Sequence, residues 1–325
     1  MHTSSMRAAF LAGSTLTALA APAFAQDTAI SGVSIQGAGV VAKEATSASK
    51  SDIPLLELPR AVSVVTAEEI RDRSADTLTR IFEYTAGFNG DAYGGGPLSR
   101  SYSNVRGFLA YQYIDGLKQH DSNWGIEPFG LERAELIKGP ASALYGQASP
   151  GGLINLISKR PTQDPVREVQ VQFGSHSRLQ GAFDFGGRLD AAGKLSVRLT
   201  ALTRDAETDV RFQKDDRTYI APAITWRPSD RTEVTLLASY QSDPNLTVFQ
   251  YLPNTGTVVA SPLGYVPRNT FTGEPAFDDS HIKRYQAALL LQHRLTDHIV
   301  LRESVRHTKL DITARYLQAG AVQSN

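Results

Sequence analysis

Few residue types in this sequence could do covalent or metal chemistry. The chain has no cysteine, which excludes a thiol nucleophile, a disulfide framework and a cysteine-ligated metal. Its seven histidines are scattered, and the spacing of the closest pair, His293 and His298, matches no common metal motif. The spacing of residues in a single sequence cannot show which nucleophile lies beside which base, so no catalytic constellation is readable here. The formal net charge of zero argues against a nucleic-acid-binding protein.

One stretch is unusually rich in turn-forming residues. "IKGPASALYGQASPGGLINLISKRP" (137–161) combines glycines and prolines with apolar strand-formers and has no charge between Lys138 and Lys159. Its segment "GPASALYG" invites comparison with a phosphate-binding loop, but no Gly-Lys-Ser/Thr follows it. Glycine permits positive φ and close approach, and proline stiffens turns. The four glycines are Gly139, Gly146, Gly151 and Gly152.

The N-terminus predicts export from the cytoplasm. Arg7 precedes an apolar run that ends in the small-x-small triplet Ala23-Phe24-Ala25, which is typical of a signal peptide in residues 1–25. A transmembrane helix is the alternative, but the run is short and contains serine and threonine. No other run approaches the ~20 apolar residues of a spanning helix. A membrane protein with this sequence would therefore have to be a β-barrel.

Residues 26–51 are small and polar, a composition that cannot bury enough apolar surface to fold. We expect a flexible arm. Within it, Ile30, Val33 and Ile35 form a β-prone patch that could add a strand to the sheet of a partner. A plain linker is the alternative interpretation.

Residues 52–160 predict a compact mixed α/β domain. "AVSVVT" is typical of a strand, and Thr66 with Glu69 forms a capping box that begins a helix. Leu78, Ile81 and Phe82 continue the helical spacing until Gly87 ends the helix. Shorter strand-like segments follow in "SNVRGF", "YQYIDGL" and "LERAELIKG".

From residue 166 to residue 325 the pattern has a period of two, as in "REVQVQFGS" and "LSVRLTALTR". It predicts about seven antiparallel strands of about 9 to 12 residues, the length of a tilted strand that crosses a bilayer. Tight turns such as "LDAAG", "PSDR" and "TDH" alternate with long connections such as "DAETDVRFQKDD". That asymmetry is typical of outer-membrane barrels and is not explained by a soluble β-sandwich.

Together these patterns predict a plug domain followed by a transmembrane antiparallel β-barrel. Barrels of ~22 strands form outer-membrane transporters with a plugged lumen. A plug must place turns and small side chains against a close wall, which would explain the composition of residues 137–161. Since about seven strands of an expected ~22 are present, we expect the barrel to be incomplete and the chain to be a fragment or an early-terminated reading frame.

The sequence also resembles a known family, the TonB-dependent siderophore receptors. The resemblance rests on "LLELPRAVSVVTAEEI", "VRGF" followed by "YIDGL", "LERAELIKGPASALYGQASPGGLINLISKRPT" and "YIAPAITWRP". It runs from about Asp52 to the end of the chain and is closest to ferrichrome-type hydroxamate receptors. It implies a receptor of the Gram-negative outer membrane that binds a ferric siderophore as cargo, contacts membrane lipid, is energised by TonB, is not an enzyme and needs no cofactor.

The resemblance also implies sites. An aromatic-lined ligand site would suit a neutral, bulky iron complex. "FQYLP" matches an aromatic-x-aromatic-Leu-Pro segment of the family, and Arg100 is the substitute for a ligand-binding arginine of the family. The TonB box would lie near Ile30 to Gln36. The candidate ligand-binding residues are Tyr93, Arg100, Trp124, Phe249 and Tyr251.

Arg106 of "VRGF" and Arg133 of "LER" are candidates for the lock between plug and barrel. In the family, arginines of these segments pair with barrel glutamates. The alternative is that both are exposed plug arginines.

Other functions stay open at this point. Haem, cobalamin or a glycan are alternative cargoes, although His281 alone makes a poor case for haem. A signalling receptor would carry an additional folded domain before the plug, for which residues 26–51 leave no room. An extracellular enzyme, an adhesin and a non-functional truncated receptor complete the alternatives.

Overall fold

The computed structural model describes residues 50, 57–91, 102–119, 125–146, 148–245 and 252–317. All of them belong to one compact unit of the chain. The predicted signal peptide and the arm with Ile30, Val33 and Ile35 lie outside the described residues. No helix in the described ranges is long and apolar enough to cross a membrane.

The plug domain is built on a five-stranded sheet with the order β1-β7-β8-β5-β6. Neighbouring strands are antiparallel except β5 and β8, which run parallel. A separate three-stranded sheet has the order β2-β3-β4. The strands are β1 (Val62–Thr66), β2 (Phe88–Asn89), β3 (Asn104–Val105), β4 (Phe108–Leu109), β5 (Tyr111–Ile114), β6 (Leu117–Lys118), β7 (Leu131–Lys138) and β8 (Gly152–Ser158).

The predicted helix after β1 is two short helices, α2 (Ala67–Asp72) and α3 (Leu78–Phe82), so the prediction of one helix up to Gly87 was wrong. Thr66 Oγ1 caps α2 by accepting from Glu69 N at 3.3 Å, which confirms the Thr66 half of the predicted capping box, and the Glu69 carboxylate pairs with Arg73. Ser74 has φ 51°, and Thr77 Oγ1 accepts from Arg80 N to begin α3. Serine, aspartate and threonine compete with the helix for backbone hydrogen bonds, which explains the break.

The core of the plug lies between these helices and the five-stranded sheet. The spacing of Leu78, Ile81 and Phe82 correctly identified the face of α3 that packs inward, where Phe82 is completely buried. Tyr113 on β5 is buried among apolar side chains, and this burial raises the pKa of its hydroxyl. Two further short helices are the 3₁₀ helix η3 (Pro128–Gly130) and α4 (Ser142–Tyr145).

The glycine-rich stretch 137–161 contains the end of β7, α4 and β8. A Cβ on Gly151 would overlap the carbonyl oxygen of Val105, and one on Gly152 would overlap that of Ile137. Gly152 also has φ 142°, which favours glycine. Close approach was therefore predicted correctly, but at these two positions the wall is the backbone of the plug itself rather than the barrel.

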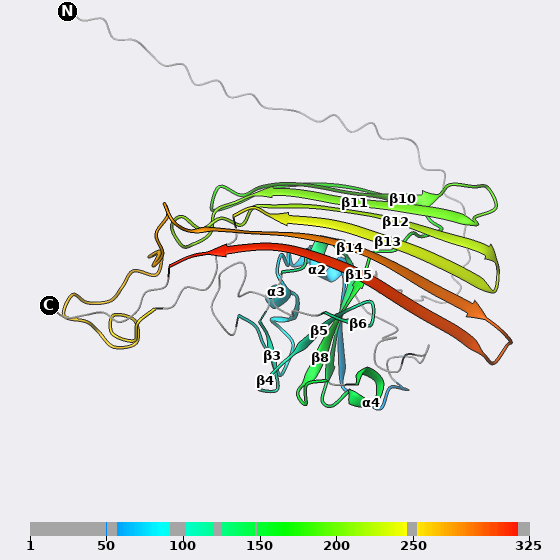
Figure 1. Cartoon of the computed structure of the whole chain (residues 1–325), viewed down its shortest axis with the longest axis horizontal. Helices are drawn as coiled ribbons and strands as arrows, with labels where there is room; N and C mark the ends of the chain where they lie inside the picture. The colour runs from blue at the N-terminus through cyan, green and yellow to red at the C-terminus, as the bar shows by residue number, and fades with distance from the viewer. Residues whose placement is uncertain are drawn as a thin grey trace, which may run out of the picture. The chain divides into compact units, whose positions relative to one another are not determined.

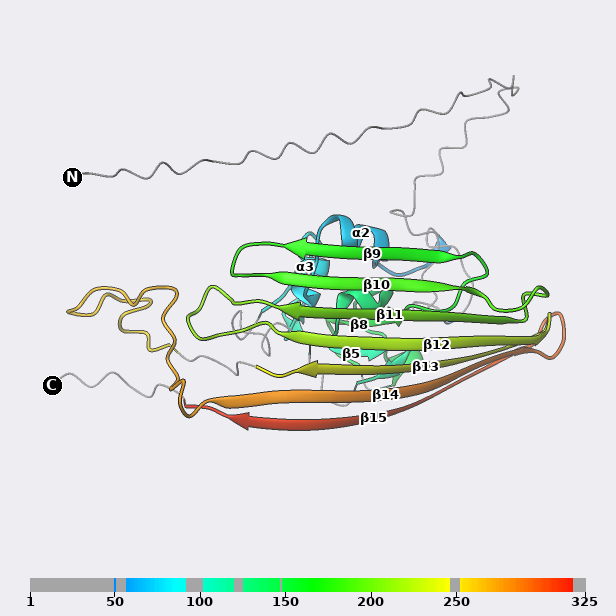
Figure 2. The same cartoon turned by 90° about the horizontal axis from the view of Figure 1, so that it is seen from above.

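Seven long strands form the second sheet, in which each strand pairs with the next along the chain (Figure 2). The period-two segments predicted all seven. Strands β12 (13 residues), β14 and β15 (16 residues each) exceed the predicted length, and β9 (8 residues) falls below it. The strands are β9 (Val166–Phe173), β10 (Leu179–Arg188), β11 (Leu195–Asp205), β12 (Arg217–Ser229), β13 (Thr232–Asp243), β14 (Asp279–Arg294) and β15 (Val300–Arg315).

The two ends of this sheet differ. At the turn end, residues 189–194, 230–231 and 295–299 connect the strands, and at the loop end the connections are 174–178, 206–216 and 244–278. This confirms the predicted alternation of tight and long connections. At the turn end, Asp190 accepts hydrogen bonds from Leu195 N (2.7 Å) and Lys194 N (3.2 Å), which lower the pKa of Asp190.

The sheet has a polar face and an apolar face, and the polar face is the buried one. Ser196, Arg198 and Thr200 of β11 are at most 8% exposed, whereas Val169 and Phe173 of β9 are 70% and 80% exposed. We call the buried side the plug face, because the plug domain lies against it (Figure 1). A water-soluble sheet would show the reverse distribution. Polar residues toward the lumen and apolar residues toward lipid are the pattern of an outer-membrane barrel. In the described residues the sheet is open, with β9 and β15 at its edges.

Candidate functional site

The plug domain and the plug face are joined by buried ion pairs. Three carboxylates, Asp115, Glu127 and Asp184, are each paired with a cationic group across this interface and bind further groups on their own side of it. A charge removed from water is tolerated when it is paired and hydrogen-bonded, and each of these centres meets that condition.

The first centre is Glu127, the residue before η3. Its Oε1 accepts from Phe129 N at 3.1 Å, and its Oε2 lies 3.2 Å from Arg217 Nη1 and 3.5 Å from Arg204 Nη1. Arg217 also forms a bidentate pair with Asp243, at 2.6 and 3.1 Å. Arg204 binds Asp215 through the main-chain oxygen (2.8 Å) and through Oδ1 (3.1 Å). One plug carboxylate is therefore fixed to strands β11 and β12.

The second centre is Asp184 on β10, which is completely buried. Lys159, just after β8, places its Nζ 2.7 Å from Asp184 Oδ2. Arg198 forms a bidentate pair with the same carboxylate and reaches Glu132 of β7 at 3.1 Å. Here the carboxylate belongs to the sheet and the lysine to the end of the plug.

The third centre is Asp115, in the turn between β5 and β6. Its oxygens accept from Ser158 N (3.0 Å) and Ser158 Oγ (2.7 Å) within the plug. Arg306 of β15 donates to Asp115 Oδ2 at 2.6 Å and to the main-chain oxygen of Ile114 at 2.7 Å. This centre fixes the last described strand of the sheet to the plug.

Further contacts hold the plug segment around η3 against the sheet. The main-chain oxygen of Gly125 accepts from Gln241 Nε2 at 2.7 Å and from Arg284 Nη1 at 3.4 Å. The phenol of Tyr219 on β12 packs so closely on Gly130 that a Cβ there would overlap it. The plug segment 125–130 is therefore held by four neighbouring strands, β11 to β14.

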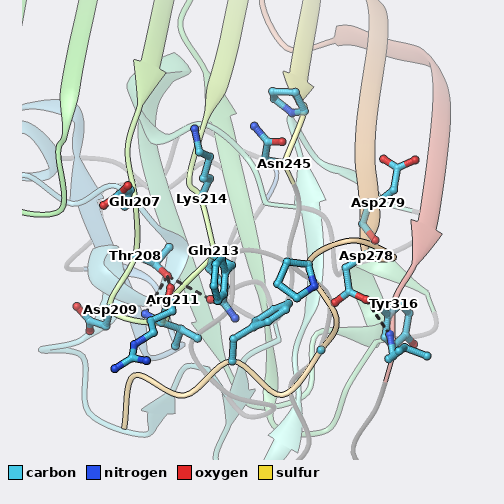
Figure 3. Close-up of a pocket in the computed structure, with 18 residues that line it drawn as sticks. Glu207, Thr208, Asp209, Arg211, Gln213, Lys214, Asn245, Asp278, Asp279 and Tyr316 are labelled. Atoms are coloured by element: carbon cyan, nitrogen blue, oxygen red, sulfur yellow. Dashed lines mark hydrogen bonds between the residues drawn. The ribbon is translucent and has the colours of Figure 1, made fainter. Parts of the chain in front are cut away.

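A cavity of about 690 Å³ lies at the loop end of the sheet (Figure 3). It is lined by the connections 206–216 and 244–278 and by residues just after β15. Phe212 and Phe271 form an edge-to-face pair in it, with ring centroids 5.9 Å apart. Arg211 N donates to Asn269 O at 3.1 Å and so joins the two connections. The ionisable residues of its lining are Glu207, Asp209, Arg211, Lys214, Asp278, Asp279 and Tyr316.

This outer pocket combines aromatic rings with polar and charged groups, a composition that suits ligand binding. Aromatic rings supply contact area, and convergent polar groups fix the orientation of a ligand. Among the described residues, no group of histidine, aspartate and glutamate side chains has the arrangement of a metal site.

The five predicted ligand-binding residues, Tyr93, Arg100, Trp124, Phe249 and Tyr251, all lie outside the described residues. Three of them lie in sequence next to described residues. Trp124 precedes Gly125, which the sheet holds, and residues 246–251, which contain Phe249 and Tyr251, follow Asn245, which lines the outer pocket.

The two predicted lock residues are described. Arg106 lies in the turn between β3 and β4 with φ 51°, and its N–H donates to Gly87 O. Arg133 on β7 pairs with Glu135 of the same strand at 2.6 Å. The described structure brings neither arginine to a barrel glutamate, and that pairing stays a prediction.

The interface arginines were missed by sequence reasoning. Arg198, Arg204, Arg217 and Arg306 all face the plug. Arg198 alternates with the apolar residues Val197 and Leu199 along β11. A charged residue repeated on the polar face of a predicted barrel strand was the available signal. The pocket residues Phe212 and Phe271 were also missed, and their signal was an aromatic residue inside a long connection.

Comparison with known proteins agrees with this architecture. Residues 54–153 match the family model "TonB-dependent Receptor Plug Domain". The chain is 36% identical over 303 residues to the ferrichrome outer membrane transporter/phage receptor of Escherichia coli (strain K12), covering 90% of this chain and 39% of that protein. It is 31% identical to the ferrioxamine B receptor of Salmonella typhimurium (strain SL1344), covering 95% and 45%.

Solved structures support the fold. The ferric preacinetobactin receptor BauA from Acinetobacter baumannii superimposes with a TM-score of 0.77 at 19% identity, over 88% of this chain and 43% of that one. The ferripyoverdine receptor of Pseudomonas aeruginosa gives a TM-score of 0.73 at 20% identity, over 81% and 36%. The chain spans less than half the length of these relatives. It therefore carries the plug domain of the TonB-dependent receptors followed by part of a receptor barrel, and it is similar to the N-terminal portion of the siderophore receptors of that family.

Proposed function

We propose that this protein is an outer-membrane receptor that takes up ferric siderophores and is energised through TonB. The observation that carries the proposal is a receptor plug domain fastened by ion pairs to the polar face of a sheet whose other face is apolar. Similarity to proteins named for ferrichrome and ferrioxamine B favours a hydroxamate siderophore as the cargo. No bond is made or broken in such a transport step, so the protein acts as a transporter and not as an enzyme.

The nature of the interface suits this function. A plug held by apolar packing would expose that surface to water on moving, at about 25 cal/mol per Å². A plug held by carboxylates and arginines exchanges its contacts for water, whose hydrogen bonds replace them. TonB pulling on the arm, through a box at Ile30, Val33 and Ile35, would shift the plug and open a path along the plug face.

The ligand site is proposed to lie at the loop end, above the plug. Tyr93, Arg100 and Trp124 supply it from the plug, and Phe249 and Tyr251 from the connection 244–278. The neighbouring pocket with Phe212 and Phe271 supports this location, because it opens beside Asn245 on the same connection.

The remaining expectations complete the proposal. Residues 1–25 are removed after Ala25, residues 26–51 form the arm, residues 52–160 the plug, and residues 166–325 barrel strands. Arg106 and Arg133 lock the plug to barrel glutamates.

The test is uptake of radioiron-labelled ferrichrome and ferrioxamine B by receptor-deficient cells that express the intact gene product. We expect uptake that requires TonB. Replacement of Phe249 and Tyr251 by alanine should weaken binding by on the order of 1 to 3 kcal/mol for each ring lost. Tyr265→Ala is the matched control, since Tyr265 lies in the same connection and is 65% exposed. Binding of neither complex, or uptake without TonB, would contradict the proposal.

A further inference from the structure

One group of buried charges touches both the plug and the connections that line the outer pocket. We call it the Glu127 cluster, and its members are Glu127, Arg204, Asp215, Arg217 and Asp243. We propose that this cluster couples the two regions, so that plug segment 125–131 and connection 206–216 become ordered or loosened together. The proposal rests on the proposed function only in that a ferric siderophore would be the ligand of the outer pocket. The coupling itself is a property of the unliganded protein.

On the plug side, the cluster holds a single short segment. Glu127 is 3% exposed and binds Arg204 and Arg217 through one oxygen, while its other oxygen accepts from Phe129 N. Gly125 lies two residues before Glu127, and its main-chain oxygen accepts from Gln241 Nε2. The same Nε2 also donates to Asp243 Oδ2. A displacement of segment 125–131 therefore has to move the arginine side chains or break their pairs.

On the pocket side, the same arginines close the base of connection 206–216. Arg204, near the end of β11, is bonded twice to Asp215, two residues before Arg217 begins β12. Arg217 forms its bidentate pair with Asp243, the last residue of β13 and the residue before connection 244–278. Connections 206–216 and 244–278 both line the pocket, through Lys214 and Pro244 among others. A change there reaches Arg204 through Asp215, the residue after Lys214, and Arg217 through Asp243, the residue before Pro244.

The charge balance explains why the cluster should respond as a unit. With Arg284, which reaches Gly125 O at 3.4 Å, three arginines and three carboxylates lie together away from water. Removal of Glu127 leaves the group with an excess positive charge that no solvent screens. Breaking one partner of a buried ion pair is strongly destabilising for that reason. The remaining arginines are then expected to reorganise, and Arg204 carries Asp215 with it.

The alternative is that the plug and the connections are held independently by neighbouring contacts. The two explanations predict different results when each side is perturbed in turn, because an energetic coupling between two sites acts equally in both directions. A perturbation on the plug side must loosen the connection, and a perturbation on the connection side must loosen the plug segment.

The experiment is hydrogen–deuterium exchange on the unliganded intact gene product in detergent micelles. Glu127→Gln removes the charge and keeps an oxygen for Phe129 N, and Asp215→Asn does the same on the other side. We expect Glu127→Gln to speed exchange in 206–216, and Asp215→Asn to speed exchange in 125–131, by about fivefold or more. Glu132→Gln is the control, since Glu132 is a half-exposed plug glutamate whose partner Arg198 retains Asp184. It should leave both segments unchanged.

An effect of either variant that stays within its own segment would overturn the proposal. If Glu127→Gln fails to assemble, Glu127→Asp retains the charge on a shorter side chain and should loosen both segments in parallel with a smaller amplitude. Loosening of 125–131 alone in that variant would again overturn it. Since no siderophore is used, failure of the coupling and failure of the proposed cargo are told apart.

Discussion

Position 130 requires glycine because a side chain of the sheet packs against it. Its φ is not in the left-handed region, so its backbone would accept another residue, but an added Cβ would overlap the phenol of Tyr219. The contact couples η3 to β12 next to Glu127. A glycine that sequence patterns would assign to a turn is thus a packing position between two domains.

We expect Gly130→Ala to destabilise the protein by about 1 to 3 kcal/mol, because overpacking a filled site forces backbone shifts. The free energy of unfolding from lipid vesicles measures it. Gly181→Ala on β10 is the matched control, since a Cβ there meets no heavy atom within 4 Å. Equal stability of the two variants would show that the plug does not approach β12 as closely as described.

At the scale of elements, the break between α2 and α3 can be tested by whether one substitution raises or lowers the free energy of unfolding. Thr77 begins α3 as its N-cap, whereas in one continuous helix it would be an interior residue. Loss of an N-cap costs about 1 kcal/mol, so Thr77→Ala should destabilise the plug as much as Thr66→Ala does. In a continuous helix, alanine would instead stabilise by up to about 0.7 kcal/mol. Equilibrium unfolding of both variants decides between these outcomes, and a stabilised Thr77→Ala protein would contradict the break.

The elements also show what a sequence can predict here. The strands of the second sheet were predictable because period two and turn residues are local signals, and β9 to β15 follow in chain order. The break at Ser74 was missed because Leu78, Ile81 and Phe82 show helical spacing soon after it, which predicts a continuation of the helix that begins at Thr66. The ion pairs were not predictable, since Glu127 and Arg217 are 90 residues apart and nothing local joins them. The same holds for Asp115 and Arg306, which are 191 residues apart.

At the scale of the whole molecule, the second sheet buries its polar face and exposes its apolar face. The plug supplies partners for the polar face through Asp115, Glu127 and Glu132. The apolar face has no such cover among the described residues, and Leu236, Leu289 and Val305 are 38–54% exposed on it. Burial of that face in lipid is the arrangement that satisfies both sides, and it agrees with relatives that are outer-membrane receptors.

An arginine on the apolar face distinguishes lipid from water. Leu236 lies in the middle of β13, opposite Leu289 of β14 and Ile224 of β12. If lipid covers this face, Leu236→Arg should cost about 2 to 4 kcal/mol, the penalty for arginine near the bilayer midplane. If water covers it, a surface substitution should change stability by no more than about 0.5 kcal/mol. Leu263→Arg is the control, because Leu263 is 99% exposed in connection 244–278, away from any strand.

Unfolding from lipid vesicles gives the stability of both arginine variants, and fractionation of cells shows whether each variant reaches the outer membrane. Equal stability of the two arginine variants, or recovery of the unaltered protein in the soluble fraction, would contradict a membrane position for the sheet.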